Sequence, residues 1–177
     1  IGLSLTMLNT DQYRRAVYYL KAILTVDNQN FQHWARLGTA YFNLGLVKKE
    51  KSSNVSMPQT DSAQLFSSLS VSAYQQAMSL DQAGKADYFY EIGRNYARIQ
   101  EDYDKAIENF RNALSLNPNL IPAREDLGIS LMLAGQFEAA VNNFQAILAS
   151  DPNNMNARLN LGYTQLQAAL ARKTNGD

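Results

Sequence analysis

Residues 104–118 and 138–152 are two versions of one sequence. The first reads Asp-Lys-Ala-Ile-Glu-Asn-Phe-Arg-Asn-Ala-Leu-Ser-Leu-Asn-Pro, and the second reads Glu-Ala-Ala-Val-Asn-Asn-Phe-Gln-Ala-Ile-Leu-Ala-Ser-Asp-Pro. They align without a gap, so that Phe110 matches Phe144 and Pro118 matches Pro152. An internal repeat of this kind, with a period of about 34 residues, indicates a structural unit that is stacked on further copies of itself.

Each repeat predicts a pair of helices. In the first helix, a large apolar residue precedes a glycine and an aromatic residue or Leu follows, all on one helical face. This pattern occurs at Trp34–Tyr41, Phe89–Tyr96 and Leu127–Leu131. The second helix carries apolar residues at i, i+4 and i+7. Pro118 and Pro152 then end two of the units, because Pro cannot continue a helix.

The repeat glycines are expected where two helix backbones come closest. Gly93, Gly128 and Gly162 recur with nearly the same period as the aligned segments. A larger residue there would push the helix axes beyond the usual packing distance of about 8–10 Å. One helix pair cannot bury its own apolar face, so the pairs are expected to stack.

The repeat period, the small-residue positions and the terminal Pro resemble the tetratricopeptide repeat family, over nearly the whole chain apart from about residues 48–68. The resemblance implies an all-α fold, a right-handed superhelical stack of antiparallel helix pairs that forms an α-solenoid. We expect a single domain over residues 1–177. Its expected units are a partial one at about 1–28, one at 31–82, one at 86–118, one at 120–152, and a terminal helix at 155–172.

Both ends of the array are expected to be irregular. In residues 1–28, Asn9-Thr10-Asp11 predicts a turn between two short helices. The sequence begins at Ile1 without an initiator Met or a basic region, which leads us to expect a processed product or a piece of a longer chain. No second helix follows the terminal helix, which is therefore either a natural cap or the point where a longer array was cut.

The second unit contains an insertion of about 20 residues, over about 48–68. Ser, Asn and Pro predict a loop at about 52–60. Asp61-Ser62-Ala63-Gln64 resembles a pattern that begins a helix. We expect two over-long helices joined by a mobile loop. Val55, Met57, Leu65 and Phe66 of this segment are expected either to dock a partner or to belong to a solvated loop.

The resemblance also implies that the first helices line a concave groove, which takes an extended peptide or a helix of a partner protein. Groove positions carried over from the family are Arg36, Thr39, Phe42, Asn43, Tyr90, Arg94, Arg98, Glu125, Ile129, Met132, Leu159, Tyr163 and Leu166. One subclass of the family grips a carboxylate chain end with Lys and Asn at fixed groove positions. These positions hold other residue types here, for example Ala35 and Thr39, so that clamp is absent.

The predicted groove residues leave alternatives open. Arg94 and Arg98 lie one helical turn apart, and such a pair can hold a carboxylate of a partner. Alternatively, Arg94 pairs with Glu91 or Glu125 on a wet surface. Met132, Leu133, Leu159, Tyr163 and Leu166 either form an apolar floor for a partner helix or pack against the neighbouring helix.

Composition argues against several other functions. Lys plus Arg and Asp plus Glu number 16 each, and this balance does not favour binding to nucleic acid. No apolar run approaches the ~20 residues that span a bilayer, so direct membrane insertion is not expected. The chain has no Cys and a single His, His33, which rules out the usual metal sites and nucleophilic dyads. His33 is expected at a helix end, and Asp102 among the residues that begin a helix.

These observations predict an interaction scaffold and not an enzyme, with no catalytic, cofactor or metal residues. The alternatives are a self-assembly module, in which units stack end to end as a homo-oligomer, and a regulatory arm of a larger enzyme. The lack of Cys does not fix the compartment. Of the cytoplasm and the periplasm, we expect the cytoplasm to be the location of this protein.

Overall fold

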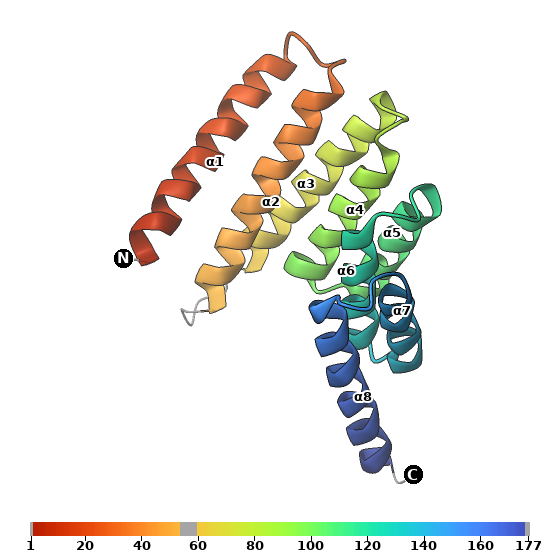
Figure 1. The fold of residues 1–177 in the computed structure, drawn as a ribbon. Coiled ribbons are helices and arrows are strands. Elements are labelled where there is room, and N and C mark those ends of the chain that lie inside the picture. Colours follow the sequence, from red (N-terminus) through yellow and green to blue (C-terminus); the bar gives the residue numbers. More distant parts are fainter. Residues whose placement is uncertain (1, 54–59, 176–177) are drawn as a thin grey trace. The chain divides into compact units, whose positions relative to one another are not determined.

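The computed structural model describes residues 2–53 and 60–175, and within these ranges the chain is all-α, with no strand (Figure 1). The elements are α1 (Gly2–Leu24), α2 (Phe31–Ser53), α3 (Thr60–Leu80), α4 (Lys85–Asn95), the π-helix η1 (Tyr96–Gln100), α5 (Tyr103–Leu116), α6 (Ile121–Leu133), α7 (Phe137–Ser150) and α8 (Met155–Asn175). They form two compact units, residues 1–101 and 102–177. The predicted single domain over 1–177 and its right-handed superhelical sense stay predictions.

In the first unit, α2 packs against both α1 and α3, and α4 packs against α3 (Figure 1). One core cluster, which includes Leu24, Leu37 and Tyr41, joins α1 to α2 and α3. A second cluster joins α3 to α4 around Tyr74. A Cβ added to Gly38 would lie 3.0 Å from the Tyr74 ring, so this repeat glycine does admit a close helix contact, as the sequence predicted.

In the second unit, α6 packs against α5 and α7, and α7 packs against α8. The aligned residues Phe110 and Phe144 are completely buried. Ala106 and Ala140, which lie four positions before them, are also completely buried. Gly128 lies against the Phe144 ring, where an added Cβ would come within 2.6 Å of ring atoms. The repeat alignment thus identified the core of this unit correctly.

The predicted turn at Asn9-Thr10-Asp11 is wrong, because α1 continues through it as one helix. No Gly or Pro interrupts residues 3–24. Asn, Thr and Asp each cost only about 0.5 kcal/mol relative to better helix formers, and packing of the helix on a neighbour overrides a cost of that size. Thr10 is itself buried.

The inserted segment forms the two over-long helices that the sequence predicted. α2 reaches Ser53 and α3 begins at Thr60, close to the predicted start at Asp61. The predicted mobile loop at about 52–60 lies largely outside the described residues, together with Val55 and Met57. Of the other two insertion residues, Leu65 is exposed, whereas Phe66 stacks against Tyr41 with ring centroids 6.2 Å apart.

Candidate functional site

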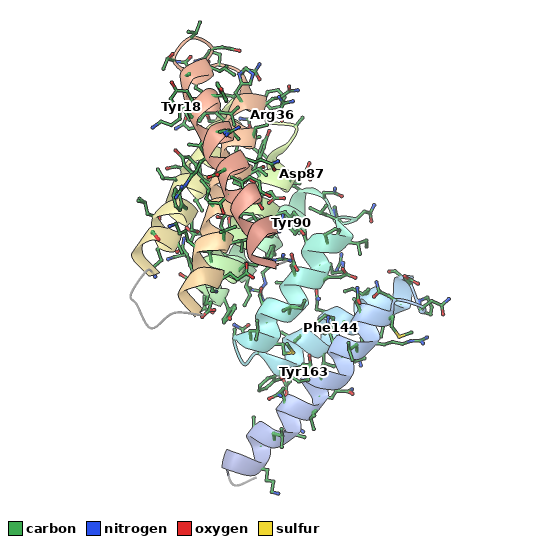
Figure 2. The ribbon with its side chains drawn as sticks, turned by 90° about the vertical axis from the view of Figure 1, so that its left-hand side faces the viewer. Tyr18, Arg36, Asp87, Tyr90, Phe144 and Tyr163 are labelled. Atoms are coloured by element: carbon green, nitrogen blue, oxygen red, sulfur yellow. The ribbon has the colours of Figure 1, made fainter. Side chains whose placement is uncertain are left out.

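The predicted groove residues of the first unit come from α2, α4 and η1 (Figure 2). Several of them are already engaged within the chain. The Thr39 hydroxyl lies 3.0 Å from the Tyr74 hydroxyl, and Asn43 donates from Nδ2 to the Thr39 carbonyl. Arg36 remains exposed on α2. This part of the surface is therefore polar and internally bonded.

Arg94 is held in place by three groups. Its Nη1 donates to both carboxylate oxygens of Glu91, at 2.8 and 2.9 Å. Its guanidinium also lies 4.8 Å from the centroid of the Phe42 ring and 5.6 Å from that of Tyr90. The prediction that Arg94 pairs with Glu91 is confirmed. Because Glu91 compensates its charge, Arg94 is a poor receptor for a partner carboxylate.

A polar cluster lies between α3 and the α4–η1 segment, and it consists of Ser67, Asn95 and Gln100. Asn95 is fully buried and donates from Nδ2 to the Glu91 carbonyl. The Ser67 hydroxyl accepts a hydrogen bond from Gln100 Nε2 at 3.0 Å. Lys49 of α2 donates to Glu101, just after η1, at 2.6 Å. These bonds fix the end of the α4–η1 segment against the over-long helices of the insertion.

The second unit presents a different, apolar surface. A row of large, exposed side chains lies on one helical face of α8, and its members are Met155, Leu159, Tyr163, Leu166 and Leu170. Leu159 is 72% exposed and Tyr163 50% exposed. We call this the α8 row. Leu133, Leu159, Tyr163 and Leu166 are thus exposed, whereas Met132 is partly buried, and the apolar floor for a partner helix stays a prediction.

α6 contacts α8. Leu133 of α6 is half exposed, whereas Ile129 and Met132 are partly buried. Glu125 accepts a hydrogen bond from Asn154 Nδ2 at 3.0 Å, which ties the start of α8 to α6. Glu125 is thus bonded to the residue that directly precedes Met155, the first member of the α8 row.

The sequence analysis missed a hollow of about 470 Å³ in the first unit. Its floor is formed by Trp34, Leu37 and Tyr41 of α2, and its walls are α1 and α3. The Trp34 Nε1 donates to the Asn28 carbonyl, so the polar atom of this side chain is already hydrogen-bonded within the chain. No signal in the sequence shows such a gap, because it depends on how far apart α1 and α3 lie.

The remaining polar candidates have structural roles. Asp102 begins α5 by accepting a hydrogen bond from the backbone N–H of Lys105, as predicted for a helix start. The bonds with Lys105 hold the pKa of Asp102 below its ordinary value. His33 lies in the first turn of α2, 3.5 Å from the Asp27 carboxylate. The described ranges contain no group of three residues that could hold a metal ion, and none of their helices is long and apolar enough to cross a membrane.

Family models of the tetratricopeptide repeat match residues 86–120 and 125–171. The chain contains tetratricopeptide repeats over these residues. The matched residues cover most of the second unit and extend into α4 of the first. They include the two segments that the repeat spacing had identified.

Three solved structures share the helical repeat fold. The second TPR domain of human RPAP3, in complex with an HSP70 peptide, is 18% identical, with a TM-score of 0.51; the match covers 69% of this chain and 96% of that one. YrrB, described as a TPR protein with an unusual peptide-binding site, is 22% identical over the whole of this chain and 77% of its own, with a TM-score of 0.58. MamA AMB-1 is 20% identical over 95% of this chain and 79% of its own, with a TM-score of 0.63.

No curated protein sequence matches the chain. At these identities, the solved structures establish the fold alone. The expected all-α solenoid of helical repeats is confirmed, and this fold typically serves protein interaction. Which residues bind is a separate question.

Proposed function

We propose that this repeat protein is an interaction scaffold that binds the apolar face of a partner helix on the α8 row. The exposure of the row carries the proposal. Large apolar side chains rarely stay contiguous and uncovered on a folded protein, unless the surface binds something. The proposal places function in binding and not in catalysis.

The chemistry of the row fits an amphipathic helix. Its side chains repeat at helical spacing, so they form an apolar strip along α8. An amphipathic helix lays a matching apolar strip, with anchors at positions i, i+4 and i+7, into such a surface. Leu, Met and Tyr are suited to this contact, and Tyr is enriched among residues that dominate binding energy. No charged side chain belongs to the row itself.

The polar surface of the first unit is less suited to capture a charged partner. Arg94 is neutralised by Glu91, and Thr39 and Asn43 bond within the chain. RPAP3 was solved with a peptide, and YrrB has a peptide-binding site. Both support peptide binding as a general property of this fold. Our proposal differs in assigning the contact to apolar side chains of the second unit.

The test is a pulldown from a lysate of the source cells, followed by binding measurements. A captured protein would be identified, and a peptide spanning its helix would be titrated by fluorescence anisotropy. Substituting Leu159→Glu and Tyr163→Glu together should weaken the affinity at least tenfold, because two charges would face the partner's apolar strip. Their exposure means that the fold should survive, which circular dichroism would check.

The matched control is Arg36→Glu on α2, which is also exposed but lies in the other unit. We expect it to leave peptide affinity within twofold of wild type. Equal affinity for the wild type and the Leu159/Tyr163 variant would refute the proposal. Loss of binding with Arg36→Glu instead would move the site to the first unit.

A further inference from the structure

The hollow beside α2 has the size and the lining of a small-molecule site. Its volume of about 470 Å³ lies within the range of about 300–1,000 Å³ that is typical of such sites. Trp34 and Tyr41 bound the floor seven positions apart on α2, so the floor is about 10 Å long at about 1.5 Å per residue. Leu24 of α1 and Leu69 and Ala73 of α3 make the walls apolar as well. The hollow therefore suits a compact apolar group of about that length.

A glycine and an aromatic ring align the helix pair of this hollow with a helix pair of the second unit. Gly38 on α2 lies against the Tyr74 ring of α3, and Gly128 on α6 lies against the Phe144 ring of α7. The two pairs can therefore be compared position by position, with α2 matched to α6 and α3 matched to α7.

Two of the matched positions are apolar in the first unit and polar in the second. Where α6 has Arg124 and α7 has Asn143, α2 has Trp34 and α3 has Ala73. Asn143 donates from Nδ2 to the Arg124 carbonyl at 2.8 Å, so a polar side chain bridges α6 and α7. Ala73 has no side-chain atom that could form this bond. The hollow thus lies where the first unit has exchanged two polar side chains for apolar ones.

Trp34 keeps the hydrogen bond that this repeat position makes elsewhere in the chain. Its Nε1 donates to the Asn28 carbonyl, six residues earlier. Arg124 donates from Nη2 to the Pro118 carbonyl, also six residues earlier. The repeat position therefore calls for a donor, and an Arg side chain supplies it. The large apolar ring is a feature of the first unit alone among these two.

One charged group borders the hollow. Among the described residues that line it, Lys21 in the last turn of α1 carries the only charge. Three further lining residues, Thr25, Ser72 and Gln76, are polar but neutral. Burial raises the pKa of the Tyr41 hydroxyl above its ordinary value, so this phenol adds no negative charge at neutral pH. A negatively charged group on a ligand would thus meet a cation and no anion.

We infer that the hollow binds a small organic acid, whose apolar body lies on the α2 floor and whose carboxylate lies beside Lys21. The apolar body replaces water against apolar side chains, which supplies most of the binding free energy. Lys21 is exposed, so its charge selects acids over amines but contributes a smaller part of the affinity. This site takes a small molecule in the first unit, and it is additional to the binding of a partner helix on the α8 row.

The chain contains its own probe of this site, because Trp34 is its only tryptophan and lines the hollow. Sodium octanoate is titrated into the full chain, below the concentration at which it forms micelles, and the fluorescence of Trp34 is recorded. We expect a saturable change, together with a midpoint of thermal unfolding that rises with octanoate. Octanol has the same chain without charge, and octylamine has it with the opposite charge. The affinity should decrease in the order octanoate, octanol, octylamine.

Two variants test the charged and the apolar parts of the site. Lys21→Glu should weaken octanoate binding by about fivefold or more and strengthen octylamine binding, because it reverses the charge. Ser72→Phe places a ring in the hollow from α3 and should remove the saturable response. The matched control is Ser79→Phe, which puts the same ring on an exposed position of α3 that does not line the hollow. All three residues are exposed, so the variants should fold, and circular dichroism checks this.

Four results would overturn this assignment. A wild type that shows neither a saturable fluorescence change nor a rise in the unfolding midpoint excludes the site. Equal octanoate affinity for Lys21→Glu and wild type excludes recognition of the acid by Lys21. Binding that survives in Ser72→Phe places octanoate elsewhere on the chain. A response of Trp34 to the partner's helical peptide, without a response to octanoate, assigns the hollow to protein binding. Leu159 and Tyr163 are unchanged in all these variants, so failure of this site is distinguishable from failure of the α8 row.

Discussion

Gly128 on α6 lies against the ring of Phe144 on α7, at a distance that leaves no room for a methyl group. A Cβ added to Gly128 would come within 2.6 Å of the ring, and Phe144 is completely buried. The ring cannot move aside without disturbing the core that encloses it. This one contact sets how closely the two helices of a repeat approach.

The Gly128→Ala substitution should destabilise the protein by about 1–3 kcal/mol, as overpacked cores do. Gly162→Ala adds the same methyl group at the equivalent position, but in open space. It should stabilise α8 by roughly 0.5–1 kcal/mol, because Ala favours a helix over Gly. Urea denaturation of both variants gives the two free energies. Two changes of the same sign would contradict this assignment.

Tyr74 should make the first unit sensitive to alkaline pH. Burial raises the pKa of its hydroxyl, with a further increase from the charge of Glu91. Burial and the hydrogen bond to Asp81 raise the pKa of Tyr88 to about 12. A raised pKa contributes stability that is fully present below the unfolded value of about 10 and is lost as the pH rises through the folded value.

The Tyr74→Phe substitution keeps the ring against Gly38 and removes the titrating hydroxyl. At neutral pH it should cost roughly 0.5–1.5 kcal/mol, for the lost hydrogen bond with Thr39. Between about pH 10 and 12, the stability of the variant should fall less steeply than that of wild type. Denaturant titrations at several pH values measure both. If the stability of the variant and that of the wild type fell equally steeply with pH, Tyr74 would ionise as readily in the folded state as in the unfolded state.

Asp102 should stabilise the start of α5. Its side chain accepts a hydrogen bond from the backbone N–H of Lys105. Asp102→Ala should therefore lower the free energy of unfolding by about 1 kcal/mol, and Asp102→Asn by much less. Its pKa is lowered, chiefly by the hydrogen bond with the Lys105 side chain. The carboxylate's contribution is therefore present above the unfolded pKa and is lost as the pH falls through the folded pKa. The stability of Asp102→Asn should fall less steeply than that of wild type as the pH is lowered. An unchanged dependence on pH would count against the role of Asp102 at the start of α5.

Arg94 and Glu91 should show only modest coupling in a double-mutant cycle with alanine, about 0.3–1 kcal/mol. Their side chains are 22% and 27% exposed, so solvent screens the pair. Arg94→Ala alone should cost more than Glu91→Ala, because it also uncovers the Phe42 ring. Urea denaturation of the four proteins gives the coupling. Equal single costs would mean that the ring contact adds nothing.

The repeat spacing predicted much of the fold because packing in a repeat protein is local in sequence. The alignment of the two segments identified Phe110 and Phe144 as core residues, and both are fully buried. The insertion was predicted as two long helices because loop residues are confined to about 52–60 and a helix-start pattern follows at Asp61–Gln64. The turn predicted at Asn9–Asp11 does not form, because weak local preferences yield to the packing of α1 on α2.

The candidate site was predicted less well, because the position of a residue in the repeat specifies where its side chain points but not which residues it contacts. Phe42 was expected to line the groove, but it is buried beneath Arg94. Arg94 was considered as a site for a partner's carboxylate, but it is hydrogen-bonded to the carboxylate of Glu91. The predicted residues Leu159, Tyr163 and Leu166 do lie together on one face of α8. Their role in binding stays a prediction.

By itself, the sequence determined the helix pairs, their period and the small residues that let the helices of a pair approach. These features depend on side-chain size and on spacing along one helix, both of which the sequence states directly. The tertiary structure alone decided which of these small residues have another helix packed against them. Gly128 and Gly162 are the same residue in the same register, yet one is buried and the other open. The difference is the helix that lies against each of them, because burial belongs to a pair of surfaces and not to one residue.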